Sequence, residues 1–166
     1  MSANDSDLLL KFQRQGDVEA LISYGQNRGY SDARLRAVLV SIQTILEALS
    51  LGLQPDYDNV DRKRLLELQP ETILVVHAMY ESEAADLKTA GLHLMGVLNL
   101  EPFLQDLQDA VASAHDWERI EAIGALTRMT HPQARTILES LSQHPDAVTR
   151  QAASKALAEV DAKPKP

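Results

Sequence analysis

The amino-acid sequence predicts an all-α protein, an α-solenoid of antiparallel helix pairs with a helical N-terminal cap. Three observations support this fold class. The chain is rich in leucine and alanine but only 4% aromatic, a balance that favours helices over a sheet. Its C-terminal half repeats with a period of 31 residues. Within each repeat, apolar residues recur at the spacing of one helix face.

The repeat is clearest in three segments that begin with a cation and align without gaps. The cations are Lys88, Arg119 and Arg150. Three positions later stand the small residues Gly91, Ala122 and Ala153. Four positions after those stand the large apolar residues Met95, Leu126 and Leu157. These offsets place the residues on one helix face, where a small residue lets a neighbouring helix come close. We therefore predict that Ala122 and Ala153 are buried at helix–helix contacts.

A second amphipathic stretch precedes each segment. Its equivalent apolar residues are Val76, Leu107 and Leu138, and the prolines near its start are Pro70, Pro102 and Pro132. Proline suits the first helical turn because its missing N–H would be unpaired there. The sequence therefore predicts three helix–turn–helix units over residues 70–160, and a disordered tail over residues 161–166.

Residues 1–69 are predicted to be helical without keeping the 31-residue period. We expect a short helix leading to Phe12, another through Leu21, a long helix from Ser31 that ends before Gly52, and a fourth through Leu65. This region is either a cap or a divergent pair of repeats, because the end of a stack must be covered. The whole chain is predicted to form one continuous domain.

Charge and composition narrow the classes of partner. The net charge is -8, and residues 70–160 hold 13 acids and 6 bases. An acidic body repels phosphate backbones, so we expect no nucleic-acid partner and instead a protein with a basic surface. There is no long uncharged apolar window and no secretion signal, so we expect no membrane contact and a cytoplasmic location. The oligomeric state stays open.

No pattern in the chain indicates catalysis. The sequence contains no cysteine, which excludes thiolate chemistry. His77 and His93 can meet across one helix pair, but their spacing is not diagnostic of a metal site. The loop that begins at Asp56 starts like a calcium loop, yet Val60 and Asp61 stand where a ligand and a glycine are needed. We therefore expect no catalytic residues, no metal and no cofactor.

Two features allow both a structural and a functional interpretation. The cation that opens each second helix is either a ladder for an anionic partner or a structural group that bonds the turn, and its recurrence in every unit favours structure. Trp117, the only tryptophan, is either a partner-binding anchor or a partly buried staple. The predicted partner-binding residues on the second helices are His93, Trp117, Glu121, Arg128 and Lys155.

The last unit, from His144 to Val160, resembles the second helix of a HEAT-like repeat, most closely the short subtype named after phycobilisome lyases. The matching residues are Asp146, Val148, Arg150, Ala153, Ala156 and Leu157. Weaker matches extend the resemblance over about half of the chain. It implies a non-catalytic scaffold or adaptor that binds a protein on the concave face of a short solenoid. The alternative is a lyase-like or chaperone-like subunit that acts on a chromophore-binding protein.

Overall fold

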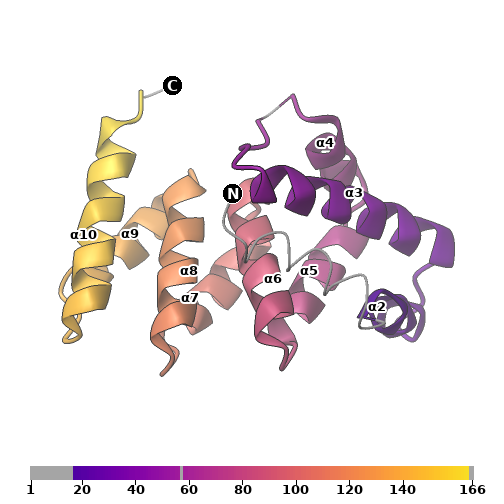
Figure 1. Ribbon diagram of the computed structural model, residues 1–166, viewed down its shortest axis with the longest axis horizontal. Helices are drawn as coiled ribbons and strands as arrows, with labels where there is room; N and C mark the ends of the chain where they lie inside the picture. The colour runs from indigo at the N-terminus through magenta and orange to yellow at the C-terminus, as the bar shows by residue number, and fades with distance from the viewer. Residues whose placement is uncertain (1–16, 57, 165–166) are drawn as a thin grey trace. The chain divides into compact units, whose positions relative to one another are not determined.

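Helices joined by short turns make up the described part of the chain, which in this computed structural model comprises residues 17–56 and 58–164 (Figure 1). The elements are α2 (Asp17–Gln26), α3 (Asp32–Ser50), α4 (Val60–Glu67), α5 (Glu71–Glu81), α6 (Ala85–Leu98), the 3-10 helix η1 (Glu101–Phe103), α7 (Leu104–Val111), α8 (Asp116–Arg128), α9 (Pro132–Leu141) and α10 (Ala147–Ala162). The predicted all-α fold class is confirmed. The helix expected near Phe12 lies outside the described residues.

The chain divides into two compact units, with the boundary between Leu94 and Met95, inside α6. The first predicted helix pair, α5 and α6, therefore falls mainly in the first unit, and the pairs α7–α8 and α9–α10 form the second. The proposed division into a cap over residues 1–69 and repeats over residues 70–160 stays a prediction.

In the first unit, α3 supplies much of the core. Ser31 caps α3 by accepting a hydrogen bond from the Arg34 backbone N–H, and Gly52 follows the helix with a φ of +77°, a conformation that glycine adopts without strain. One face of α3 is buried, with Leu35, Val38 and Ile42 fully inaccessible to solvent. Gly91 of α6 lies close to α5, since a Cβ there would be 3.0 Å from the Tyr80 nitrogen.

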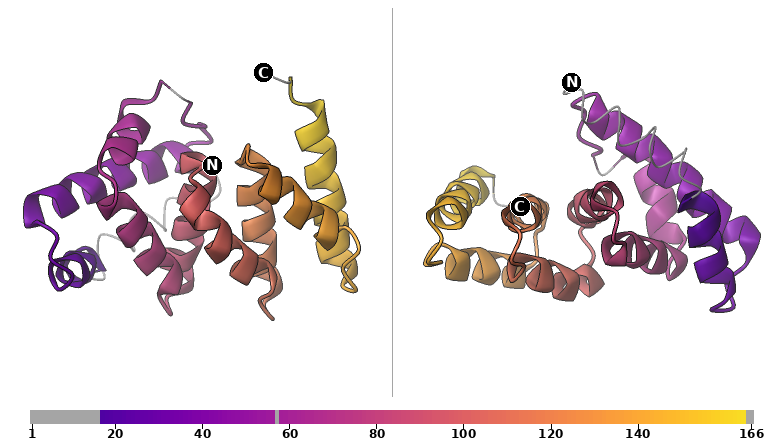
Figure 2. Two further views of the ribbon diagram at one scale, coloured as in Figure 1. Left: turned by 180° about the vertical axis from the view of Figure 1, so that it is seen from behind. Right: turned by 60° about the horizontal axis from the view of Figure 1, so that its bottom comes forward.

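In the second unit, α7 and α9 form one layer, and α8 and α10 form the other (Figure 2, right). Ala122 and Ala153 are fully buried in this layered packing, which confirms the predicted burial of the small residues. Gly96 also serves close packing, because a Cβ there would be only 2.9 Å from the Cα of Ala125.

The C-terminal helix is longer than the sequence suggests. Asp161 and Ala162 belong to α10, although the sequence pattern predicts that the disordered tail begins at residue 161. Directly after the helix, the Lys163 Nζ donates a hydrogen bond to the Thr127 carbonyl at 2.8 Å. Among the described helices, none has both the length and the apolar character needed to cross a membrane.

Candidate protein-binding face

One side of α8 remains open to solvent. Trp117 keeps 39% of its surface exposed, and Glu121, Gly124 and Arg128 are half-buried further along the helix. Successive offsets of 4, 3 and 4 residues keep these four positions on one helix face. The opposite face is buried, with Ala122 at its centre. The open side therefore forms a continuous stripe from the first turn of α8 to the last.

The same stripe recurs on α10, one repeat later. Val148 is 57% exposed, Lys155 and Glu159 are exposed, and Ala152 is half-buried. Helices α8 and α10 pack against each other and lie side by side in Figures 1 and 2. We call the eight positions of the two stripes the second-helix face: Trp117, Glu121, Gly124, Arg128, Val148, Ala152, Lys155 and Glu159.

Trp117 and Val148 set this face apart from the rest of the second unit. Among described residues 95–164, they are the large hydrophobic side chains that remain exposed, and they occupy the same position in adjacent repeats. The Trp117 ring stacks on His115 with 6.4 Å between centroids. Single exposed apolar residues need no explanation. Here two of them meet the solvent at equivalent ends of neighbouring helices.

Arg128 closes the stripe at the C-terminal end of α8. It is half-buried, and no ion pair or hydrogen bond holds its guanidinium within the described parts of the chain. Burial lowers the pKa of Arg128 below its ordinary value, and the negative charge of Glu121 opposes this shift. A cation that is partly removed from water without a bonded carboxylate gains from an external anionic group.

The structure brings four of the five predicted binding residues onto the second-helix face. These four are Trp117, Glu121, Arg128 and Lys155. His93 is half-buried on α6 and belongs to the first unit. The other four positions of the face were not among the predicted residues: Gly124, Val148, Ala152 and Glu159. A 31-residue step from Trp117 or Arg128 points directly to Val148 and Glu159.

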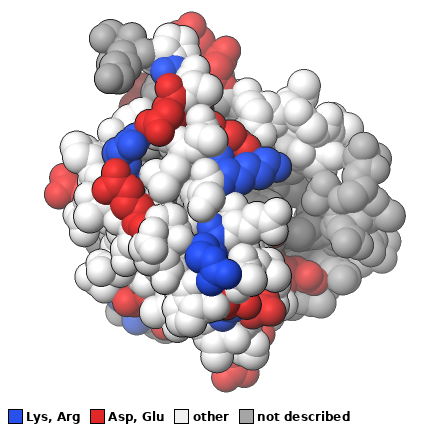
Figure 3. Space-filling view, turned by 90° about the vertical axis from the view of Figure 1, so that its left-hand side faces the viewer, with Lys and Arg blue, Asp and Glu red and all other residues white. Residues whose placement is uncertain are grey.

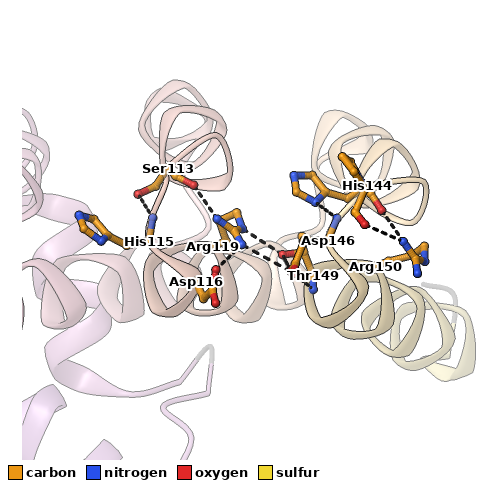
Figure 4. A network of polar contacts seen from close by, with 9 residues as sticks. Ser113, His115, Asp116, Arg119, His144, Asp146, Thr149 and Arg150 are labelled. Carbon is orange, nitrogen blue, oxygen red and sulfur yellow. Dashed lines mark hydrogen bonds and ion pairs between the residues drawn. The ribbon is translucent and has the colours of Figure 1, made fainter.

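Arg119 holds α8 and α10 in register (Figure 4). Its Nε donates to Thr149 Oγ1 at 2.9 Å, and its Nη2 lies 3.5 Å from the Asp146 carboxylate. In its own turn, Arg119 donates to the Ser113 carbonyl at 2.9 Å and pairs with Asp116. Because one guanidinium bonds two consecutive turns, it fixes the spacing of the two stripes.

The other two repeat cations make local contacts. Arg150 donates to the carbonyls of His144 and Pro145, at 2.8 and 3.2 Å, within its own turn. Lys88 lies above the Tyr80 ring, 5.1 Å from its centroid. The expected bonding to both turn carboxylates and turn carbonyls is therefore found at Arg119, whereas Arg150 bonds the carbonyls of its own turn.

The histidines near the repeat turns have structural contacts. His144 Nδ1 accepts a hydrogen bond from the Asp146 backbone N–H at 3.0 Å, which orients the residue that caps α10. His131 Nε2 lies 3.2 Å from the Asn99 carbonyl. In the first unit, His77 lies 3.7 Å from Glu81. Each of these contacts joins an imidazole to a neighbouring turn or to the surface of its own helix.

A second surface feature of this unit lies away from the second-helix face. An open hollow of about 370 Å³ lies on the side of the first helices and is lined by Glu101, Pro102, Leu104, Gln105 and Gln133. This lining includes neither a nucleophile paired with a base nor a set of convergent charges. Viewed from the α10 side of Figure 1, Lys and Arg alternate with Asp and Glu around uncharged surface (Figure 3). The acid excess of the chain does not gather into a single-sign patch on that side.

Comparison with known proteins agrees with this architecture. Residues 100–165 match the family model of HEAT repeats. No curated protein and no solved structure matches the chain significantly. The family match does not single out the phycobilisome-lyase subtype, which stays a resemblance. The matched region contains α7 to α10, so the helix pairs that form the second-helix face are the part of the chain that is similar to HEAT repeats.

Proposed function

We propose that this protein is a non-catalytic interaction module that binds another protein through its second-helix face. The exposure of Trp117 and Val148 at one repeat position is the observation that favours this function. HEAT-like repeats use the surface of stacked helices to bind proteins. Aromatic side chains with apolar neighbours and a polar rim are typical anchors of such surfaces.

The charged side chains of the second-helix face indicate the charge pattern of the partner's surface. Glu121 and Glu159 contribute negative charge, whereas Arg128 and Lys155 contribute positive charge. A partner that fits this face presents both signs around an apolar centre. The uniformly basic surface expected from the acid excess is therefore a poorer match than a surface of mixed charge.

A comparative pull-down with matched baits tests the proposal. The wild-type chain, Trp117→Ala and Val148→Ala are immobilised separately, with Leu53→Ala as the control. Leu53 is 59% exposed but lies in the loop between α3 and α4. We expect a partner that the wild type and the control retain and that both face variants lose. For the purified partner, Trp117→Ala should lower the affinity by roughly thirtyfold, since removal of an anchor commonly costs about 2 kcal/mol.

A second variant separates the electrostatic steering of association from the packing of the bound complex. Glu121→Lys should change the rate of association and its salt dependence more than the rate of dissociation, because charges at the rim of an interface act on diffusional encounter. The circular dichroism spectrum of each variant should match that of the wild type. If Trp117→Ala instead melts the protein and leaves the affinity unchanged, Trp117 is a packing residue and the binding surface lies elsewhere.

A further inference from the structure

We infer that the second-helix face binds a second copy of this chain, through antiparallel pairing of α8 with α8 of the other copy at Gly124. The inference rests on the proposed function only in taking the second-helix face as the binding surface. It assigns a homotypic partner to that surface. Three independent properties of the α8 stripe support it: a small residue at its centre, charges placed symmetrically about that centre, and exposed apolar surface at one end.

Gly124 is a glycine that the fold itself does not need. A Cβ at Gly91 would be 3.0 Å from the Tyr80 nitrogen, and one at Gly96 would be 2.9 Å from the Ala125 Cα, so close packing explains both. A Cβ at Gly124 would have no atom of the described structure within 4 Å. Glycine within a helix destabilises it relative to alanine. Its benefit at Gly124 therefore lies in an approach from outside, where a missing side chain lets two helix axes come closer than usual.

The charges of the stripe are self-complementary. In an antiparallel pair, residues equally far before and after the centre of the crossing lie opposite each other. Glu121 lies 3.5 residues before a centre at position 124.5, and Arg128 lies 3.5 residues after it, or about 5 Å along the axis in each direction. Glu121 of one copy therefore faces Arg128 of the other, and the twofold axis repeats the pair.

This pairing supplies what Arg128 lacks within one copy. Arg128 is half-buried, and its guanidinium is bonded to no carboxylate of the described residues. Closure of the interface removes more water from this group, and a carboxylate from the other copy compensates its charge in the same step. A parallel pairing would instead set Arg128 opposite Arg128, which charge repulsion disfavours.

The exposed Trp117 side chain at the N-terminal end of the α8 stripe also gains a contact in the pair. Trp117 lies 7.5 residues before position 124.5, or about 11 Å along the helix axis. This distance reaches past the facing Arg128, where α8 of the other copy ends and Met129 becomes extended. The exposed indole ring therefore packs over the C-terminal end of the facing helix. The twofold axis repeats this contact at the other end of the helix pair.

Sedimentation velocity of the purified full chain tests the inference directly. The wild type should show a monomer–dimer equilibrium that shifts to dimer as the concentration rises. Glu121→Arg places two guanidinium groups opposite each other at each end of the crossing, and Arg128→Glu places two carboxylates opposite each other. Each variant alone should therefore self-associate at least about tenfold more weakly than the wild type.

Mixing the two variants is the decisive step. In a heterodimer of Glu121→Arg with Arg128→Glu, each copy carries a single sign of charge at both positions, so every facing pair is again attractive. The mixture should therefore form dimers that neither variant forms alone. Asp109→Arg is the matched control, because it makes the same charge change at an exposed position of α7 and should leave the equilibrium unchanged. Circular dichroism establishes that each variant is folded. If Arg128→Glu fails to fold, Arg128→Gln replaces it and should weaken the wild-type dimer.

Three outcomes overturn the inference. They are a wild type that stays monomeric at all concentrations, folded charge variants that dimerise like the wild type, and a mixture that shows no recovery. None of these outcomes contradicts the proposed function, which the pull-down tests with a different protein as the ligand. Conversely, a wild-type dimer with the predicted charge rescue, together with a failed pull-down, shows that the second-helix face serves self-association alone.

Discussion

Arg119 and Thr149 form a buried hydrogen bond between consecutive repeats, with 2.9 Å between Nε and Oγ1. Only 8% of the Arg119 side chain is exposed. The guanidinium is therefore a buried polar connection between α8 and α10, and its removal should weaken the contact between the two repeats.

Arg119→Met should destabilise the protein. The substitution keeps an apolar stem but leaves the Ser113 carbonyl and Thr149 hydroxyl without their donor, which costs roughly 1–3 kcal/mol. Arg150→Met is the matched control at the same repeat position, because Arg150 is exposed and bonds only its own turn; it should change the stability by at most about 0.5 kcal/mol. Urea unfolding measures both. Equal losses would contradict a role for Arg119 between repeats.

Asp146 should make the stability depend on acid pH. Hydrogen bonds from the Thr149 side chain and backbone hold the pKa of Asp146 below its ordinary value, and Arg119 lowers it further. Because the folded-state pKa is the lower one, this carboxylate stabilises the protein above the unfolded-state value of about 3.9. That contribution disappears as the pH falls toward the folded-state pKa.

Asp146→Asn should therefore flatten the acid side of the stability profile, while lowering the stability near neutral pH. Urea unfolding at a series of pH values measures the slope. Asp109→Asn provides the comparison, since the Asp109 carboxylate accepts a single exposed hydrogen bond from Gln105. A profile for Asp146→Asn as steep as that of the wild type would show that other carboxylates set the acid limit.

Ala122→Leu and Ala153→Leu should overpack the contacts between the two layers of the second unit. Both alanines are fully buried, and the added volume should cost roughly 1–3 kcal/mol. Ala158→Leu is the matched control, because Ala158 is exposed on α10. Thermal unfolding compares the three variants. Wild-type stability in both buried variants would show that the helices have room to separate.

The same substitution at two glycines should have opposite effects. Gly96→Ala brings a Cβ within 2.9 Å of the Ala125 Cα, so the helices must shift, and roughly 1–3 kcal/mol is lost. Gly124→Ala meets open space and should stabilise the monomer by about 0.5–1 kcal/mol, because alanine loses less backbone freedom on folding. Unfolding at low protein concentration measures both. A loss of monomer stability in Gly124→Ala would point to an internal role for this glycine.

Local sequence signals determine the helices and their order. The 31-residue period locates the pairs α7–α8 and α9–α10, and it identifies Ala122 and Ala153 as buried. Ser31 is recognisable as a cap because its side-chain oxygen can accept a hydrogen bond from a backbone N–H of the first helical turn. These features depend on residues a few positions apart, and helix geometry relates such residues in the same way in every protein.

Other features arise only when helices distant in the sequence pack together. The sequence shows a cation at Arg119, but its bonds to Asp146 and Thr149 depend on how closely α8 and α10 approach. Gly96 and Gly124 look alike in the sequence, yet one touches a neighbouring backbone and the other faces solvent. The physical reason is that periodicity defines the faces of a helix, whereas the neighbours on each side decide which face is buried.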